Sequence, residues 1–187
     1  MLYRFARFVL AIVFRIIFNF EIVNKPEKIE GSGIIVANHI SMWDPIAMAI
    51  STERSLHFMG KKEFFKYDFF NFFIYKLNAF PVDRKKGADM NAIRTALSKL
   101  KDGEVLGIFP EGTRVDSIDI SNMKEGVGYL AIKGKCPIYV YQIEADYRFR
   151  GKVKFIYKGI IDYKDYSGKT TEKSEKMTVD IFNLIYK

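Results

Sequence analysis

Two short stretches of the sequence carry residues that can do acid–base chemistry together. The first covers residues 38–44 and places a histidine, His39, before a carboxylate, Asp44, with four residues between them. A carboxylate that binds an imidazole selects one tautomer of the ring and stabilises its protonated form, as a general base requires. His39 and Asp44 are therefore candidates for a catalytic pair, and Ser41 stays open as an alternative nucleophile.

The position of this stretch in the chain also suits a site. An apolar run at residues 33–37 is typical of a buried strand, and Pro45 is typical of the first turn of a helix. His39 is then expected on the loop at the carboxyl end of the strand, where open α/β sheets bind ligands. A structural role stays open on spacing alone, because residues 41–44 also have the pattern of a capping box and Asp44 that of an N-cap.

The second stretch follows another apolar run, residues 105–109, and forms a tight turn with an acid, a hydroxyl and a guanidinium. The turn is Pro110-Glu111-Gly112-Thr113-Arg114. A guanidinium can bind phosphate through two parallel hydrogen bonds and stays charged at every working pH, but Arg114 taken alone is equally compatible with a solvated surface charge. Gly112 lets the backbone approach a ligand closely. Glu111 is unusual beside an anion, and we expect it to position Arg114 or to bind a substrate hydroxyl.

Taken together, the two stretches resemble the motifs of the 1-acylglycerol-3-phosphate (lysophosphatidic acid) acyltransferases. In that family an Asn-His-(four residues)-Asp motif supplies the catalytic base, and Phe-Pro-Glu-Gly-Thr-Arg helps to bind the phosphate of the acceptor. The resemblance covers roughly residues 22–160 and includes further segments at 60–64, 79–84 and 124–126. The chain departs from the family pattern at Asn78, Val115 and Val140, where the family has glycine, serine and proline, which leaves details of the acceptor pocket open.

The resemblance implies an enzyme that moves a fatty-acyl group from a thioester donor, acyl-CoA or acyl carrier protein, to the free hydroxyl of lysophosphatidic acid. The sequence does not distinguish these donors from an acyl phosphate. His39 would be the general base, oriented by Asp44, and the product would be phosphatidic acid. The residues implied in acceptor binding are Lys61, Arg84, Glu111, Gly112, Thr113 and Arg114. No cofactor and no metal is implied. Glycerol 3-phosphate or another lyso-lipid remains an alternative acceptor.

The composition is typical of one globular domain. The 187 residues are 49% hydrophobic and 28% charged, and the formal charge of +8 indicates an anionic partner. A basic membrane- or nucleic-acid-binding module without catalysis is therefore the alternative from another class. The aromatic residues cluster in apolar segments instead of alternating with Lys and Arg on a strand, which argues against nucleic acid. Cys136 is expected to be a buried packing residue, and His57 a packed or half-exposed one.

The N-terminal segment predicts a helix that lies in a membrane interface. Its longest uninterrupted apolar run, residues 8–14, has seven residues, whereas a spanning helix needs about 18. Apolar residues surround one narrow polar stripe, made of Arg4, Arg7, Ala11, Arg15 and Asn19. Such a helix can direct its arginines toward lipid phosphates, although burial against the domain stays open. We expect residues 1–21 to form this helix and 22–187 a single catalytic domain, peripheral (monotopic) on the cytoplasmic face of the cell membrane.

The remaining pattern predicts an α/β fold with a mixed, largely parallel sheet flanked by helices, and the family resemblance implies a glycerol-3-phosphate acyltransferase-like arrangement. Strands are expected at residues 33–37, 56–59, 105–109, 138–143 and 153–160. Helices are expected from Pro45, at 89–101 and at 177–186. The phenylalanine-rich segment at 63–77 is expected either to pack in the core or to contact membrane or line an acyl-chain slot.

Overall fold

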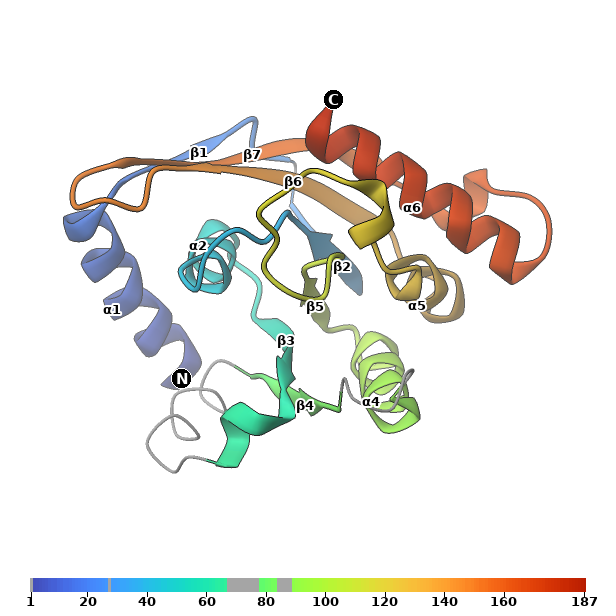
Figure 1. The fold of residues 1–187 in the computed structure, drawn as a ribbon. Helices are drawn as coiled ribbons and strands as arrows, with labels where there is room; N and C mark the ends of the chain where they lie inside the picture. The colour runs from blue at the N-terminus through green and yellow to red at the C-terminus, as the bar shows by residue number, and fades with distance from the viewer. Residues whose placement is uncertain (1, 27, 67–77, 84–88) are drawn as a thin grey trace.

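The computed structural model describes residues 2–26, 28–66, 78–83 and 89–187 (Figure 1). Its strands are β1 (Asn19–Val23), β2 (Gly33–Val36), β3 (Leu56–Lys61), β4 (Phe80–Val82), β5 (Val105–Ile108), β6 (Ile138–Ala145) and β7 (Lys152–Ile161). Its α-helices are α1 (Leu2–Ile17), α2 (Asp44–Ser51), α4 (Met90–Lys101), α5 (Gly126–Gly134) and α6 (Thr170–Tyr186). Short 3-10 helices are η1 (Lys62–Lys66), η3 (Ile120–Asn122) and η4 (Tyr163–Asp165).

The strands form one sheet in the order β1-β7-β6-β2-β5-β3-β4. Neighbouring strands run parallel except β6 and β7, which pair antiparallel. The prediction of a mixed, largely parallel sheet flanked by helices is therefore confirmed. Each strand and helix that the periodicity predicted is present, because those segments are buried on a regular face whatever their neighbours are.

The sheet has a helical layer on each face (Figure 1). Side chains alternate across β2, so Ile34 and Val36 enter the core under α4, α5 and α6, whereas Ile35 enters the core on the side of α2. Both faces of β2 are covered, and all four of its residues are buried. A fully buried parallel strand reads as a continuous apolar run, which is why the sequence signal was clear here.

The expected N-terminal helix, residues 1–21, was predicted too long, because residues from Asn19 onward belong to strand β1. The helix ends at Ile17, and Asn19–Val23 pairs parallel with the first half of β7. The partner strand β7 lies more than a hundred residues further along the chain, so no local sequence pattern indicates that residues 19–23 form a strand. The expected domain division after residue 21 remains a prediction, and it falls within this strand.

Helix α1 packs one side on the domain and leaves another side open. Phe14 and Phe18 are buried in a cluster with Ala47, Ile50 and Val153. Arg7 also faces inward and donates to the carbonyl of Thr52 at 2.5 Å, so not every arginine of the stripe is free for lipid. The large apolar side chains that stay exposed on α1 are Phe5, Phe8, Val9, Ile12, Val13 and Ile16.

No helix within the described ranges is long and apolar enough to span a bilayer. Of the phenylalanine-rich segment, residues 62–66 form η1. Residues 67–77 lie outside the described part of the chain, so its expected role in the core or at a membrane stays a prediction.

Candidate active site

The candidate catalytic pair sits just past the carboxyl end of β2. His39 Nδ1 lies 2.9 Å from Asp44 Oδ2, and the histidine side chain is 17% exposed while the aspartate is fully buried. An ionised carboxylate only accepts hydrogen bonds, so Nδ1 carries the proton and Nε2 keeps its lone pair. The geometry is that of an oriented general base with one free nitrogen.

The carboxylate of Asp44 is held by four donors. Oδ2 accepts from His39 and from the backbone N–H groups of Ile40 and Ser41, each at 2.6 Å. Oδ1 accepts from the hydroxyl of Tyr147 at 2.5 Å. The burial of Tyr147, and then the charge of Asp44, raise the pKa of this phenol, so it stays a donor at working pH.

The N-cap interpretation of Asp44 is wrong, whereas the capping-box pattern of residues 41–44 is met in part, because the Asp44 carboxylate accepts from the Ser41 N–H. Helix α2 has Trp43 at its N-cap position, and no side chain caps it. The carboxylate of Asp44 turns back to the preceding loop instead, where it binds the N–H groups of Ile40 and Ser41. The hydroxyl of Ser41 accepts a bond from the Trp43 N–H at 3.3 Å, and within the described residues it has no bond to His39. The geometry therefore favours His39, and not Ser41, as the reactive side chain.

Contacts with distant parts of the chain fix the loop that carries His39. Asn38 is buried and exchanges two hydrogen bonds with the backbone of Ile143 in β6, at 3.0 and 2.6 Å. The His39 ring stacks on Phe109 with centroids 4.2 Å apart, and the His39 carbonyl accepts from the N–H of Val115 at 3.1 Å. The two sequence motifs therefore flank one point in space.

Parallel strands explain how the motifs meet. Val36 of β2 is paired with Ile108 of β5, and β5 also pairs in parallel with β3. Their carboxyl ends lie at one edge of the sheet, which is where an open α/β sheet binds ligands. His39 follows the end of β2, the second motif follows β5, and Lys61 ends β3.

The second motif forms a tight turn beside His39. Gly112 has φ of +70°, a conformation that favours glycine, and its N–H donates to the Phe109 carbonyl at 3.0 Å. Thr113 and Arg114 project into solvent, and Lys61 is also exposed. Arg84 lies outside the described residues, so its expected place in the acceptor site stays a prediction.

Glu111 faces inward from the same turn. It is 2% exposed, and its Oε1 accepts from the hydroxyl of Tyr186, at the end of α6, at 2.7 Å. Burial raises the pKa of the Glu111 carboxyl, and the bond from Tyr186 opposes that shift. Its Oε2 is buried without a partner in the described structure, and no bond joins Glu111 to Arg114 there. A buried acceptor of this kind has capacity for one more donor, such as a hydroxyl.

Tyr147 and Tyr186 were missed by sequence reasoning. Tyr147 lies 103 positions from Asp44, and Tyr186 lies 75 positions from Glu111. Neither tyrosine belongs to a recognisable motif, and the chain has 11 of them. Only a paired contact in the folded chain distinguishes these two from the rest.

Two other candidates prove to be packing residues, as expected. Cys136 is buried, and burial raises the pKa of its thiol to about 12, so it is not a reactive thiolate. His57 is buried, and its Nε2 lies 3.6 Å from Glu104, while burial lowers the pKa of its ring. No group of three or more His, Cys, Asp or Glu side chains suited to a metal occurs in the part of the chain that the structure describes.

Comparison with known proteins identifies the family. The profile described as Acyltransferase matches residues 19–144, which include both motifs and the strands between them. The chain belongs to the acyltransferase family. This membership supports an enzyme of acyl transfer over the non-catalytic binding module, and the roles of the individual site residues remain predictions.

Two relatives of this acyltransferase have the same name, 1-acyl-sn-glycerol-3-phosphate acyltransferase. The 1-acyl-sn-glycerol-3-phosphate acyltransferase of Bacillus subtilis (strain 168) is 34% identical over 139 residues, which are 73% of this chain and 68% of that protein. The enzyme of the same name from Streptococcus pneumoniae is 35% identical over 107 residues, 56% of this chain and 39% of that protein. The acyltransferase thus spans about two thirds of one relative and less than half of the other.

The fold of this acyltransferase is also found in a crystal structure. The 1-acyl-sn-glycerophosphate (LPA) acyltransferase PlsC from Thermotoga maritima superposes with a TM-score of 0.63. The match covers 98% of this chain and 78% of that one, at 23% sequence identity. At this identity the likeness shows a shared fold, and it confirms the predicted α/β class.

Proposed function

We propose that this acyltransferase moves a fatty-acyl group from a thioester to the free hydroxyl of 1-acyl-sn-glycerol-3-phosphate and so makes phosphatidic acid. The observation that carries the proposal is the His39–Asp44 pair, held at 2.9 Å beside the turn that bears Arg114. The names of the Bacillus subtilis and Streptococcus pneumoniae relatives support the choice of acceptor.

In the proposed mechanism His39 is the general base. Its Nε2 takes the proton of the acceptor hydroxyl while that oxygen attacks the thioester carbonyl. The new C–O bond forms, the C–S bond breaks, and His39 returns the proton to the departing thiolate. Asp44 stabilises the imidazolium between these steps, and Tyr147 holds Asp44 in position.

The acceptor phosphate is assigned to the basic residues at the carboxyl edge of the sheet. Arg114 and Lys61 are exposed there, and Arg84 is placed with them by the family motif alone. Gly112 and Thr113 shape the turn, and the free Oε2 of Glu111 is suited to a glycerol hydroxyl. Arginine contributes most, because its planar fork matches a phosphate in a way that an ammonium does not.

The proposal includes a peripheral place on the cytoplasmic face of the membrane, with α1 in the bilayer interface. The outer face of α1 is apolar, and Arg4 and Arg15 are exposed near its two ends. Ile40 and Met42, on the loop that carries His39, are exposed as well and suit an acyl chain. The donor is acyl-CoA or acyl carrier protein.

An acyl-transfer assay with matched acceptors tests the proposal. Purified protein is given acyl-CoA or acyl carrier protein thioester, with lysophosphatidic acid, glycerol 3-phosphate or lysophosphatidylcholine, and products are identified by mass spectrometry. Phosphatidic acid from lysophosphatidic acid is the expected main product. Preferential acylation of glycerol 3-phosphate or of another lyso-lipid would contradict the proposed acceptor, whereas the assignment to acyl transfer would stand.

A further inference from the structure

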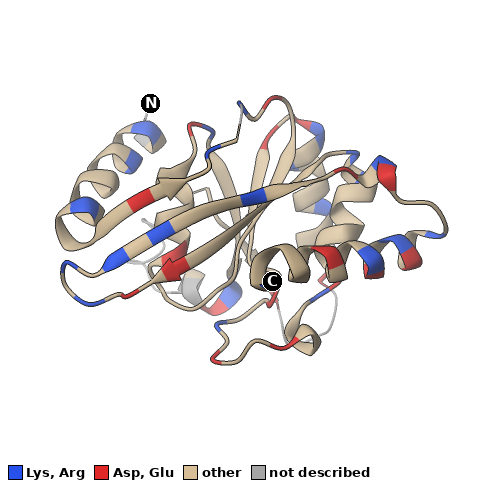
Figure 2. Ribbon diagram, turned by 90° about the horizontal axis from the view of Figure 1, so that it is seen from above, with Lys and Arg blue, Asp and Glu red and all other residues tan. Residues whose placement is uncertain are grey.

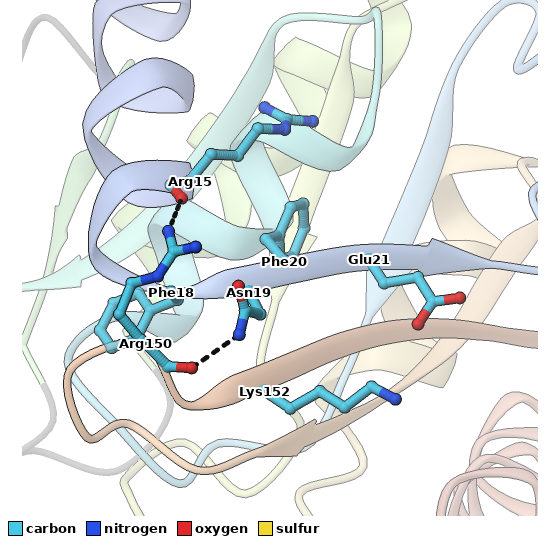
Figure 3. A pocket seen from close by; sticks show the side chains of 7 residues that line it. All are labelled: Arg15, Phe18, Asn19, Phe20, Glu21, Arg150 and Lys152. Atoms are coloured by element: carbon cyan, nitrogen blue, oxygen red, sulfur yellow. Dashed lines mark hydrogen bonds between the residues drawn. The ribbon is translucent and has the colours of Figure 1, made fainter.

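A recess of about 350 Å³ lies between the end of α1 and the start of β7, and the residues of the candidate active site do not line it (Figure 3). Three cations and one carboxylate surround it: Arg15, Arg150, Lys152 and Glu21. Phe18, Asn19 and Phe20 complete the lining. The excess of positive charge suits an anion, and the aromatic lining suits an amphipathic one.

The loop from β6 to β7 places an apolar side chain beside this recess. Phe149 is 77% exposed, more than any other large apolar side chain in the described ranges. It stands between Arg148 and Arg150, both of which are exposed. An exposed phenylalanine flanked by arginines is typical of a segment that enters a lipid interface, where the ring is buried and the guanidinium groups meet phosphates.

Hydrogen bonds join the β6–β7 loop to the end of α1. The Arg150 N–H donates to the Ile17 carbonyl at 2.6 Å, and its guanidinium reaches the carbonyls of Arg15 and Ile16 at 3.4 and 3.3 Å (Figure 3). Arg150 holds φ of +61° to do so, which a non-glycine residue rarely adopts. Gly151 permits the turn, since a Cβ there would lie 2.1 Å from the Asp146 carbonyl oxygen. Phe149 is therefore positioned together with α1.

Charge favours an anionic membrane as the occupant. The ribbon of α1 has basic positions and no acidic ones (Figure 2). The β6–β7 loop carries Arg148 and Arg150 and one carboxylate, Asp146, which pairs with Arg148 at 2.7 Å. The apolar face of α1 ends at Ile16, which is 59% exposed, next to the carbonyls that Arg150 binds. The loop thus continues the surface of the helix.

We propose that Phe149 and the adjoining recess form a second membrane contact, in which the recess receives the phosphate of an anionic phospholipid. The inference rests on the proposed docking of α1 and adds to it a contact from a distant part of the chain. The same loop carries Tyr147, whose hydroxyl binds Asp44 and whose ring packs on Phe18 at 5.3 Å. The contact therefore holds the catalytic pair close to the surface where a lyso-lipid resides.

Vesicle partitioning of the full chain tests the second contact. Vesicles of phosphatidylcholine, with and without phosphatidylglycerol, are sedimented with wild type and variants. Phe149→Ser is expected to weaken binding to both vesicle types about tenfold. Lys152→Gln is expected to weaken it about fivefold, on the anionic vesicles only. Phe149→Trp should retain binding.

Matched substitutions on α6, on the opposite side of the molecule, serve as controls (Figure 1). Val179→Ser and Lys176→Gln alter exposed side chains there and should leave partitioning unchanged. Phe8→Ser on α1 separates the two proposals. If Phe8→Ser weakens binding and Phe149→Ser does not, the second contact is wrong and α1 docking stands.

If neither substitution weakens binding, both contacts are wrong. A change in oligomeric state on gel filtration with Phe149→Ser, and unaltered vesicle binding, would assign the surface to a second copy of the chain and overturn the lipid proposal. Thermal denaturation of each variant verifies folding, and little change is expected at such an exposed position.

Discussion

At the residue scale, the chemistry depends on how completely Asp44 is bound. Its two oxygens receive bonds from His39, Ile40, Ser41 and Tyr147, and its side chain is fully buried. A carboxylate held from every side keeps the imidazole in one orientation, which is the condition for an efficient general base. Substitutions around Asp44 should therefore affect turnover more than substrate binding.

His39→Ala is expected to lower turnover by about 10² to 10⁴, the usual contribution of a general base. Because the side chain is partly exposed and lies at a loop, the melting temperature should change little. Acyl transfer and thermal denaturation are measured on the same preparation. Activity within about tenfold of wild type would contradict the assignment of His39 as base.

Tyr147→Phe is expected to lower kcat about tenfold and leave KM unchanged, because it removes one hydrogen bond to a charged group. The ring is kept, so its packing on Phe18 is retained. Steady-state kinetics with lysophosphatidic acid distinguish this outcome from a loss of substrate affinity. An unaltered kcat would mean that the loop N–H groups position Asp44 without help.

Glu111→Gln tests the consequence of a buried carboxyl whose pKa is raised. The folded state binds this proton more tightly than the unfolded state does, so the resulting stability is complete below the ordinary glutamate pKa and is lost as the pH rises through the raised value. Glutamine stays neutral. The variant should therefore gain melting temperature relative to wild type as the pH rises above the ordinary glutamate pKa and through the raised value of Glu111. A difference that does not vary with pH would contradict the burial effect.

At the element scale, α1 belongs to the folded domain as well as to the proposed membrane surface. Phe14 and Phe18 are 1% and 2% exposed, and they pack on Trp43 and Tyr147 around the catalytic loop. Deleting α1 would therefore open the core and obscure any test of docking. Single substitutions on its outer face are the appropriate experiment.

Phe14→Ala is expected to reduce the free energy of unfolding by about 3 to 5 kcal/mol, as large-to-small changes in a packed core do. Phe8→Ala, on the same helix but 63% exposed, is the matched control and should cost little. Chemical denaturation of both variants measures the difference. Equal losses would show that α1 contacts the domain through more than its Phe14 face.

At the scale of the whole molecule, three parallel strands bring separate motifs to one edge of the sheet. Strands β2, β5 and β3 lie side by side, with His39 after β2, the Arg114 turn after β5 and Lys61 at the end of β3. In the proposed mechanism the acceptor is therefore bound by groups from three segments that are far apart in the sequence.

Arg114→Ala is expected to reduce kcat/KM for lysophosphatidic acid by about ten- to a hundredfold, through loss of a charge-assisted hydrogen bond. Monoacylglycerol has no phosphate and should lose little, so the ratio of the two kcat/KM values is the measurement. Arg114→Lys should also lower the ratio, because an ammonium lacks the planar fork. An unchanged ratio would make Arg114 structural and direct attention to acceptors without a terminal phosphate.

The sequence by itself determined several of the strands and helices and the family of this acyltransferase. Continuous apolar runs and helical periodicity depend on short-range burial, so β2, β5, β6, β7 and α4 could be located without a structure. The motifs around His39 and Arg114 are also local, and their resemblance to a family pattern predicted the family that the profile match shows. Strand β1 could not be found in this way, because its partner β7 lies far along the chain.

Only the tertiary structure decided what each candidate side chain does. The spacing of residues 39–44 is compatible with a helix cap and with a catalytic pair, and the structure shows Asp44 bound to His39 and Tyr147, as the proposed pair requires. Glu111 was expected to position Arg114 or to bind a substrate hydroxyl, and the structure shows Tyr186 of α6 as its hydrogen-bond partner. These outcomes depend on contacts across 75 to 103 positions, and such contacts arise from how the sheet and helices pack, which no local pattern encodes.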